Sequence, residues 1–446
     1  MRARCDLLVK HGHILTMDAD RTEHADGALA VVAGELAEIG ATAAVTARWD
    51  AARVIDAGGG VVHPGLVDCH SHILLATTRG AFPEELTPAA YTEAVRRWFD
   101  CLDEDDEHVN ALLGALELAR NGVTFFVEPG SVFNLDAVAT AIRRVGIRAS
   151  LADGWLTDGR AGVDDVPARA PATLDASLAV LGDAARKFAD RDDLVTGHVA
   201  LWAGSSDELL VAAHRTAGEL DTIATQHQSY GDDAAEDDAR LGCHPIVHWE
   251  RLGLLGERWL LSHMNVVRAD ELEAVARCGL SVAWCPATFL NRGGAQRFGC
   301  ALPALKDHGA TIGIGADSPY FGFDSMAHLA YLVARARGDR PVTAAELLAM
   351  VTIEGARAAG VADRVGSLEA GKRADFVIRA TDVPEAHPAP ALAQSLILAT
   401  RSKGIATVVV DGRVIVEHGH HADIDEPALF HAAAASARRT LDRVAA

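Results

Sequence analysis

The sequence predicts an α/β fold: a (β/α)8 barrel, or TIM barrel, with a small β-sandwich domain built from both chain ends. Apolar strand candidates alternate with amphipathic helices over residues 61–362. Eight such units in about 300 residues suit a closed barrel better than a doubly wound sheet. Short strands with tight turns fill residues 1–60 and return at 363–446, so the 446-residue chain is expected to form two domains.

The two end segments predict one composite β domain. A turn at Ala33-Gly34-Glu35 separates two strand-like runs, and Asp411-Gly412 near the other end is a strong hairpin signal. Residues from Pro427 onward are rich in Ala and Arg, which favours a terminal helix. The expected strands cover residues 5–17, 28–32, 36–39, 374–378, 407–410 and 414–416.

Eight buried strands are expected in the barrel, and helical segments separate most of them. The strand candidates cover residues 61–70, 123–127, 147–151, 194–201, 222–227, 259–263, 280–284 and 310–314. The clearest helical segments cover residues 89–101, 109–120, 207–219, 269–277 and 325–337. In a barrel of this kind the chemistry lies at the carboxyl ends of the strands, so the residues that close each strand are the first candidates.

The first expected strand ends in His70-Ser71-His72. Successive side chains of a strand point to opposite faces, so His70 and His72 project from the same side. Neutral imidazole is the commonest protein ligand for metals, and two on one face form half of a metal site. The pair therefore predicts a metal centre if other strand ends supply the remaining ligands.

Three more strand ends carry suitable residues, namely His227, His263 and Asp317. Each has a structural alternative, because a strand-end histidine is often only hydrogen-bonded and Asp317 can cap a turn. On one rim together they favour a metal site, since three histidines and one aspartate suit a divalent cation with a position left for water. The metal would lower the pKa of that water towards about 7 and produce hydroxide. Asp317 can take the proton, and His263 can polarise a substrate carbonyl or ring nitrogen.

Motifs along nearly the whole chain resemble the amidohydrolase superfamily, most closely the branch of cytosine and guanine deaminases, S-adenosylhomocysteine deaminases and triazine hydrolases. They include Gly12-His13-Ile14-Leu15-Thr16-Met17, Pro64-Gly65-Leu66-Val67-Asp68-Cys69-His70-Ser71-His72, Ser206-Asp207-Glu208-Leu209-Leu210, Gly315-Ala316-Asp317 and Gly366-Ser367-Leu368-Glu369-Ala370-Gly371. The resemblance implies that His70, His72, His227 and Asp317 are the metal ligands and that His263 is the active-site histidine. It also implies a composite β domain and a homo-oligomer.

The chain departs from this branch in the substrate pocket. Its deaminases usually have His-x-x-Glu at the fifth strand, but Tyr230 occupies the Glu position here. A phenol with an ordinary pKa near 10 can donate a proton but carries one to and fro poorly at pH 7. The Pro-His after strand four is replaced around Trp202, and Pro286-Ala287-Thr288-Phe289 replaces Pro-x-Ser-Asn. The absence of Lys at the end of strand four argues against a carbamate-bridged binuclear centre.

These features predict a metal-dependent amidohydrolase that acts on C–N bonds other than peptide bonds. Metal-bound hydroxide would attack an electrophilic carbon of a small, planar or cyclic substrate, in amide, carbamate or urea hydrolysis or in displacement of a ring substituent. Two alternatives stay open: an N-heterocycle deaminase with Tyr230 in place of Glu, and a non-catalytic metal-binding barrel. Asp317, His263 and Tyr230 are the catalytic candidates. The candidate substrate contacts, whose structural alternative is rim packing, are Trp202, Gln228, Trp284, Phe289 and Tyr320.

Composition limits the partners and the compartment. The net charge of −21 excludes nucleic acid and anionic membranes as expected partners, which leaves a small-molecule substrate. Seven cysteines without paired spacing indicate free thiols, and neither a signal peptide nor a membrane span is recognisable, so a cytoplasmic location is expected. One divalent ion is expected, Zn²⁺ first and Fe²⁺ as the alternative, since nitrogen and oxygen ligands accept both.

Two further histidine groups are expected to lie on the surface. His244 and His248 have the i,i+4 spacing of a helical metal site. His418-Gly419-His420-His421 is a local cluster in the peripheral β domain. Neither group has an acidic residue that the barrel arrangement would bring to it.

Overall fold

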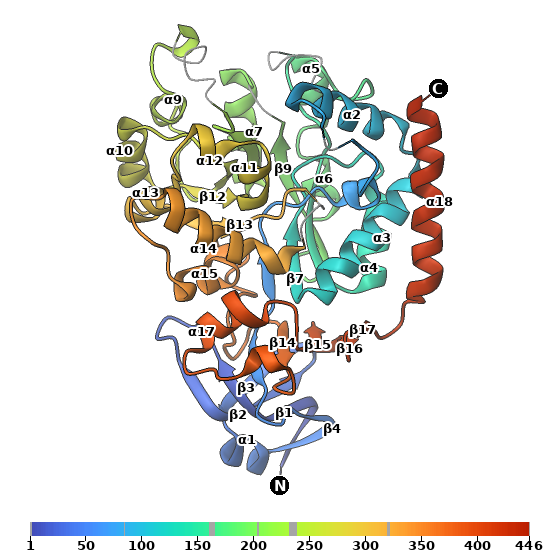
Figure 1. Cartoon of the computed structure of the whole chain (residues 1–446), viewed down its shortest axis with the longest axis vertical. Helices are drawn as coiled ribbons and strands as arrows, with labels where there is room; N and C mark the ends of the chain where they lie inside the picture. The colour runs from blue at the N-terminus through green and yellow to red at the C-terminus, as the bar shows by residue number, and fades with distance from the viewer. Residues whose placement is uncertain are drawn as a thin grey trace.

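The computed structural model describes residues 2–83, 85–159, 166–202, 205–231, 239–318 and 322–445. Figure 1 shows two parts, with the barrel above a sheet formed by the two chain ends. The C-terminal helix α18 (Glu426–Ala445) runs along the side of the barrel next to α3 (Glu104–Arg120). The predicted fold class is confirmed.

The barrel is built from eight parallel strands that follow one another in chain order. Seven of them begin and end within two residues of the positions expected from the sequence, because each is a short apolar run between helical segments. The strands are β6 (Leu66–Asp68), β7 (Val123–Val127), β8 (Arg148–Ala152), β9 (Val195–Leu201), β10 (Ala224–Gln228), β11 (Trp259–His263), β12 (Ser281–Trp284) and β13 (Thr311–Ile314).

A hydrogen-bonded seam between the first and last strands closes the barrel. The Cys69 amide donates to the carbonyl of Ile314 at 2.9 Å. Beyond the strand ends, the Asp317 amide donates to the His70 carbonyl at 2.8 Å, and the His72 amide donates to the Asp317 carbonyl at 3.1 Å. The seam thus brings the first-strand histidines beside Asp317 through backbone contacts alone.

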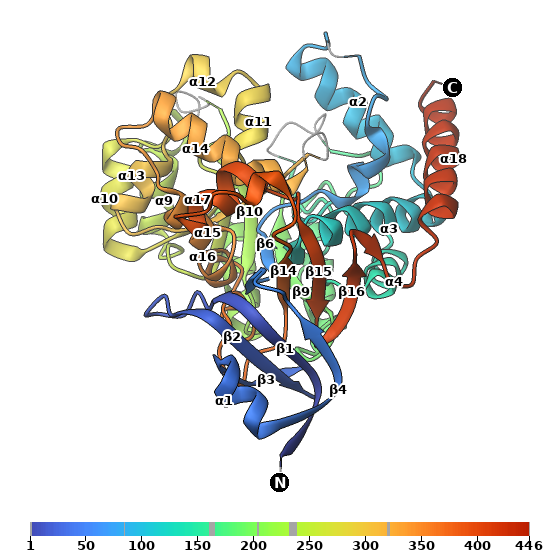
Figure 2. The ribbon, with the colours of Figure 1, turned by 60° about the horizontal axis from the view of Figure 1, so that its bottom comes forward.

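Helices surround the barrel, and several cover its carboxyl end. Figure 2 shows α2 and α11 near the top of the molecule, away from the sheet of the chain ends. The helices of the barrel region include α2 (Pro88–Cys101), α3, α4 (Leu135–Val145), α5 (Leu174–Val180), α6 (Asp183–Lys187), α7 (Asp207–Glu219), α9 (Pro245–Arg251), α10 (Ala269–Cys278), α11 (Pro286–Asn291), α12 (Gly294–Arg297), α13 (Leu302–Asp307), α14 (Met326–Arg337), α15 (Ala344–Met350) and α16 (Ile353–Ala358). A 3-10 helix, Ile73–Thr78, follows the His70-Ser71-His72 segment.

The two chain ends form one nine-stranded sheet in the order β17-β16-β15-β14-β5-β1-β2-β3, with β4 paired to β1. All nine strands therefore belong to a single hydrogen-bonded sheet. Its strands are β1 (Ala3–Leu15), β2 (Glu23–Val32), β3 (Glu35–Ala41), β4 (Trp49–Asp56), β5 (Val61–Pro64), β14 (Phe376–Arg379), β15 (Ile405–Val410), β16 (Arg413–Glu417) and β17 (His420–His421). Two short helices accompany it, α1 (Thr42–Arg48) and α17 (Leu392–Gln394).

The first expected barrel strand, residues 61–70, is divided between the two sheets. Its first part, β5, pairs with β1 and β14, and only β6 belongs to the barrel. The chain passes from one sheet to the other at Gly65, where an added Cβ would lie 1.9 Å from Thr124 Oγ1. Only glycine fits this close approach.

Buried charges join the composite sheet to the amino end of the barrel. Arg148, at the start of β8, donates from Nε to Asp375 at 2.8 Å and from Nη2 to Asp411 at 2.8 Å. The Arg148 and Asp375 side chains are almost fully buried, so both charges depend on this contact. The polar residues that follow the barrel strands lie at the opposite, carboxyl end of the barrel.

Two further expectations concern cysteines and membranes. All seven cysteines are free thiols, as their spacing predicts. Among the described residues, no helix combines the length and the apolar character needed to cross a membrane.

Candidate metal centre

Three imidazoles and one carboxylate converge at the carboxyl end of the barrel. Asp317 Oδ1 lies 3.3 Å from Nε2 of His70 and 3.3 Å from Nε2 of His72. Nε2 of His227, from β10, lies 3.4 Å from Nε2 of His72. The Nε2 atom of His70 is buried without a hydrogen-bond partner. The structure thus brings the four predicted ligands together with their coordinating atoms facing one another.

The other ring nitrogen of each histidine is held by the surrounding protein. His227 Nδ1 lies 3.0 Å from the Trp202 carbonyl, which can only accept, so the Nδ1 of His227 carries the proton and its Nε2 keeps the lone pair. His70 Nδ1 lies 2.7 Å from Ser262 Oγ, and His72 Nδ1 lies 3.0 Å from Ser131 Oγ. Partners of this kind fix the orientation of a metal-binding imidazole and the position of its proton.

The backbone turns sharply at the same strand ends. His263 has φ 77°, Asp317 has φ 60° and Ser229 has φ 49°, all in the left-handed region. A residue other than glycine costs about 1–3 kcal/mol there, and such residues cluster at functional sites. Each of the three lies at the end of a paired barrel strand or within three residues after it, and that strand fixes the backbone on the N-terminal side.

Burial governs the protonation of the centre. It lowers the pKa of His70 and of His263 to about 3, so both imidazoles are neutral. Burial also lowers the pKa of His227 well below its usual value. For Asp317 burial acts in the opposite direction, but the close polar contacts with His70 and His72 outweigh it and hold the pKa of the carboxyl well below 3.8. Neutral imidazoles and an ionised carboxylate are the forms that bind a cation.

His263 lies beside these ligands, at the end of β11. Its ring centroid is 5.4 Å from those of His70 and His227, and its Nδ1 is buried without a hydrogen-bond partner. The Tyr230 ring packs edge-on against it, with centroids 4.7 Å apart and planes at 84°. Burial raises the pKa of the Tyr230 phenol, an effect that the nearby Arg292 charge opposes, so the phenol stays protonated at neutral pH.

The predicted substrate contacts fall into three groups. Trp202 joins the centre, with its ring centroid 4.5 Å from that of His227, and the half-buried Gln228 pairs with His263 across two strands. Trp284 and Phe289 pack on each other in the main hydrophobic core, because Val282 and Trp284 face outward from β12 while Ala283 faces inward. The structure does not bring these two to the metal centre. Tyr320 lies outside the described residues.

Sequence reasoning missed several residues around the centre. Cys285 follows β12, and its sulfur lies within 4.8 Å of ligand atoms of His263 and Asp317. After β7, Ser131 contacts His72 and Glu128 holds the Ser131 hydroxyl, while Ser262 contacts His70. Cys285 and Glu128 directly follow strand runs, so the strand-end rule would have identified them. Nothing in the sequence pairs the two serines with their histidines.

The other histidine groups are engaged elsewhere. His244 Nδ1 lies 2.6 Å from Asp270, and His248 Nε2 lies 2.8 Å from Asp207. His420 is exposed and pairs with Glu426, whereas His421 is buried and its Nε2 donates to a backbone carbonyl at 2.8 Å. Among the described residues, none of these histidines belongs to a cluster of three metal-binding side chains.

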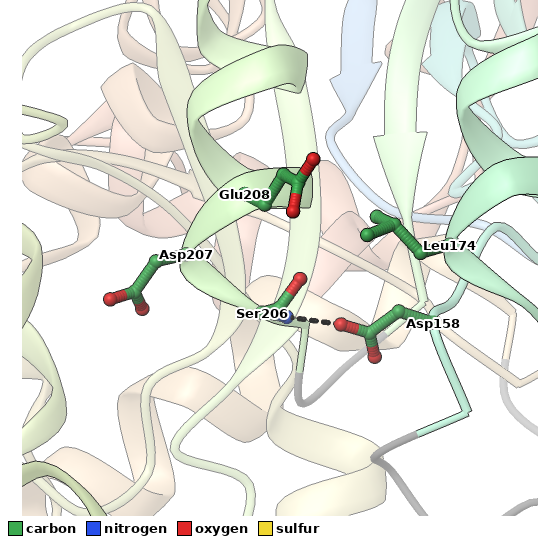
Figure 3. Close-up of a pocket in the computed structure, with 5 residues that line it drawn as sticks. All are labelled: Asp158, Leu174, Ser206, Asp207 and Glu208. Carbon is green, nitrogen blue, oxygen red and sulfur yellow. Dashed lines mark hydrogen bonds between the residues drawn. The ribbon is translucent and has the colours of Figure 1, made fainter.

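A hollow of about 320 Å³ also lies at this end of the barrel, between the loops after β8 and β9. Asp158, Leu174, Ser206, Asp207 and Glu208 line it. Figure 3 shows the Asp158 carboxylate accepting a hydrogen bond from the Ser206 amide, at 2.6 Å, beside the start of α7. Three carboxylates line the hollow, and none of the residues of the candidate metal centre does. The hollow is therefore separate from the place where we expect the chemistry.

The residues at the centre fit a divalent cation. Three imidazole nitrogens and one carboxylate oxygen form a donor set that suits zinc. Ligand atoms of His70, His72 and Asp317 lie within 4.8 Å of one another, as do those of His70, His227 and His263. The buried, unpartnered Nε2 of His70 is accounted for if an ion completes its coordination.

Known proteins share both the sequence pattern and the fold of this chain. A model of the amidohydrolase family matches residues 61–415. The 5-methylthioadenosine/S-adenosylhomocysteine deaminase of Desulforudis audaxviator (strain MP104C) is 30% identical over 459 residues, covering 98% of this chain and 100% of that protein. The corresponding deaminase of Moorella thermoacetica (strain ATCC 39073 / JCM 9320) is 28% identical and covers 91% of this chain and 93% of its own.

Solved structures share the fold over nearly the whole chain. A zinc-bound adenosine deaminase from Xanthomonas campestris superposes with a TM-score of 0.86 at 25% identity and covers 100% of both chains. An atrazine chlorohydrolase from Arthrobacter aurescens TC1, complexed with zinc, gives a TM-score of 0.84 at 23% identity over 97% of this chain and 100% of its own.

Proposed function

The chain belongs to the amidohydrolase family and is a metal-dependent hydrolase, and on that premise we propose that it hydrolytically removes a substituent from the ring of a small N-heterocycle. The observation that carries the proposal is the convergence of His70, His72, His227 and Asp317 around one point, next to the neutral His263. Deaminases and a chlorohydrolase among its relatives support the substrate class, since both reactions replace a substituent by the oxygen of water.

His70, His72, His227 and Asp317 are the proposed ligands, and zinc is the proposed ion. A divalent ion bound by them would acidify water and so supply the nucleophile at neutral pH. Two solved structures with this fold hold zinc, which supports the choice of ion.

The protein's own side chains would move the protons. Asp317 is ionised and can accept the proton of the attacking water. His263 is neutral and buried, so it can hold the attacked ring atom or the incoming oxygen by a hydrogen bond. Tyr230 is protonated beside His263 and is the proposed donor to the leaving group. The rings of Trp202 and His227 offer a surface for a planar substrate.

As a proton donor, Tyr230 suits a leaving group that takes up one proton as it departs. In this role the phenol gives a proton once per turnover and regains it from water or from Asp317 before the next. Chloride or thiolate needs no such donor, and an amine needs one. Deamination with Tyr230 as donor and displacement of a weaker base are therefore the two reactions to distinguish.

The test combines metal removal with a substrate panel. The protein is treated with a chelator, dialysed, and reloaded with Zn²⁺ or Fe²⁺, and each form is assayed on 5′-methylthioadenosine, adenosine, atrazine, and simple amides, carbamates and ureas. We expect turnover of at least one ring-substituted N-heterocycle, lost on chelation and restored by one of the two ions. Turnover confined to the acyclic amides would overturn the substrate class. Tight metal binding without turnover of any compound would instead favour a non-catalytic barrel.

A further inference from the structure

Glu128 lies behind one of the proposed metal ligands, at the end of β7. It is fully buried, and its carboxylate is surrounded by donors from its own loop. Oε2 accepts the Gly130 amide at 2.8 Å and the Ser131 amide at 2.9 Å, while Oε1 accepts the hydroxyl proton of Ser131 and has a longer contact, 3.2 Å, with the Ser131 amide. Each oxygen of Glu128 therefore acts as an acceptor, and the Ser131 hydroxyl has given its only proton away.

The direction of these bonds decides which nitrogen of His72 carries a proton. Since the Ser131 hydroxyl donates to Glu128, its oxygen can only accept from His72 Nδ1, 3.0 Å away. His72 then carries its proton on Nδ1 and keeps the lone pair on Nε2. That Nε2 atom is the one that faces Asp317 and His227.

We propose that Glu128 is a positioning residue that acts through Ser131 to set the tautomer of His72, and thereby makes its Nε2 available to a divalent cation. The inference deepens the proposed function, because it explains how one ligand of that centre is prepared before a metal arrives. Ser131 is itself held in place, since its carbonyl accepts the indole N–H of Trp155 at 3.1 Å.

The nearly isosteric Glu128→Gln variant tests the proposal because it reverses the chain of donors. The amide oxygen is expected to take the place of Oε2, which accepts the two shorter backbone N–H bonds, so the NH₂ group takes the place of Oε1. It then donates to Ser131 Oγ, whose proton must turn towards His72 Nδ1. The proton of His72 is displaced to Nε2, the atom that should bind the metal. A carboxylate-to-amide change that installs the wrong histidine tautomer has a known parallel in serine proteases.

Two measurements follow this change. The first is the ¹⁵N spectrum of the metal-free protein labelled at histidine, with His72 assigned by the signals lost in His72→Gln. We expect protonation at Nδ1 in the parent and at Nε2 in Glu128→Gln. The second is the zinc affinity by competition with a chromophoric chelator, which we expect to weaken by about 10–100-fold in Glu128→Gln.

The controls separate this role from a structural one. Glu271→Gln is the matched variant: Glu271 is also fully buried and also accepts two backbone N–H groups, but it lies on α10 away from the centre. It should leave both the His72 spectrum and the zinc affinity as in the parent. In a Ser131→Ala background, Glu128→Gln should cause no further loss of zinc affinity, because the connecting hydroxyl is gone.

Two outcomes would overturn the proposal: an unchanged His72 tautomer in Glu128→Gln, or an equal loss of zinc affinity in Glu271→Gln. If Glu128→Gln fails to fold, Ser131→Ala decides alone, and a parent-like spectrum and affinity in that variant would equally refute it. The spectrum is recorded without metal. A parent protein that binds no divalent ion would therefore refute the proposed function while leaving the tautomer question open to direct measurement.

Discussion

Two sets of buried histidines differ in what their ring nitrogens contact. His63, in β5, donates from Nδ1 to the Pro64 carbonyl at 2.7 Å and accepts from Arg379 at 2.9 Å. His198, in β9, lies between Ser150 Oγ at 2.9 Å and Thr225 Oγ1 at 3.3 Å. At the candidate metal centre, by contrast, each of the three histidines proposed as ligands has one nitrogen held by the protein and the other directed at the remaining proposed ligands.

A lowered pKa alone does not identify a metal-binding histidine. Burial lowers the pKa of His63, His198 and His70 alike, to about 3. The feature that separates them is the partner of the second nitrogen, which is a protein group for His63 and His198 but not for His70 Nε2. A shifted pKa identifies a histidine as a candidate for a functional role. Whether both of its ring nitrogens already have protein partners then decides between a structural role and a functional one.

The largest expected effect comes from Asp317→Asn. The substitution keeps the shape of the side chain but removes the negative charge that His70 and His72 face. We expect loss of bound metal after dialysis and a fall in kcat of about 10⁴-fold, the upper end for loss of an acid–base group. Metal analysis and steady-state kinetics measure both. Asp153→Asn, at a buried aspartate that accepts the Gly182 and Ala184 amides, is the control and should keep its metal. Full metal content and activity in Asp317→Asn would refute the ligand assignment.

The next effect concerns His63 and the dependence of stability on pH. The pKa of His63 is about 3 in the fold and about 6.5 in the unfolded chain, so below pH 6.5 the unfolded chain binds a proton that the folded chain does not. Stability therefore falls as the pH drops from about 6.5 towards 3, by about 2.5 kcal/mol between pH 7 and pH 4.5. Urea unfolding at the two pH values measures the loss.

In His63→Gln the side-chain amide can still donate and accept but does not titrate, so the loss between pH 7 and pH 4.5 should shrink by about that amount. His431→Gln, at an exposed position of α18, should keep the loss of the parent. Equal losses in the parent and in His63→Gln would show that His63 gains its proton without unfolding.

Tyr230→Phe is expected to have a smaller effect on catalysis than Asp317→Asn. It keeps the edge-on packing against His263 and removes only the proposed donor. For a substrate whose leaving group is an amine we expect kcat to fall by about 10²-fold, the lower end for loss of a general acid. For a chloride or thiolate leaving group kcat should stay near that of the parent. An unchanged rate with both substrate types would remove the phenol from the proton path.

The smallest expected effect comes from making the same change in both sets of histidines, the loss of a serine that contacts Nδ1. Ser262→Ala removes the partner of His70 Nδ1, and Ser150→Ala removes the partner of His198 Nδ1. We expect the first to weaken zinc binding by about tenfold and the second to leave it unchanged, with each losing about 1 kcal/mol of stability. Chelator competition and urea unfolding measure the two quantities. Equal losses of zinc affinity would mean that His198 also serves the centre.

The barrel and its polar strand ends were predictable because both follow from local patterns. Apolar runs of four to eight residues gave seven strands almost to the residue, and the side chains that close β6, β10, β11 and β13 are those at the metal centre. The edge strand β4 was missed because most of its side chains are exposed and its apolar pattern is weak.

The parts that escaped prediction depend on three-dimensional pairing. Proximity to a strand end says nothing about which face a side chain takes, so Trp284 was expected in the pocket although the alternation of β12 directs it into the core. Ser131 and Ser262 come from strand ends far from His72 and His70 in the chain, and no spacing in the sequence joins them. The tautomer of a ligand is likewise set by partners that only the fold supplies.

The seam between β6 and β13 also sets the order of events during synthesis. His70 and His72 emerge early, but Asp317, which closes the barrel against them, is made about 245 residues after His72. At ordinary rates of translation that interval is roughly 10–50 s. During it the nascent chain exposes His70 and His72 without their carboxylate. The four proposed ligands can therefore come together only after the final barrel strand, β13, has been released and paired.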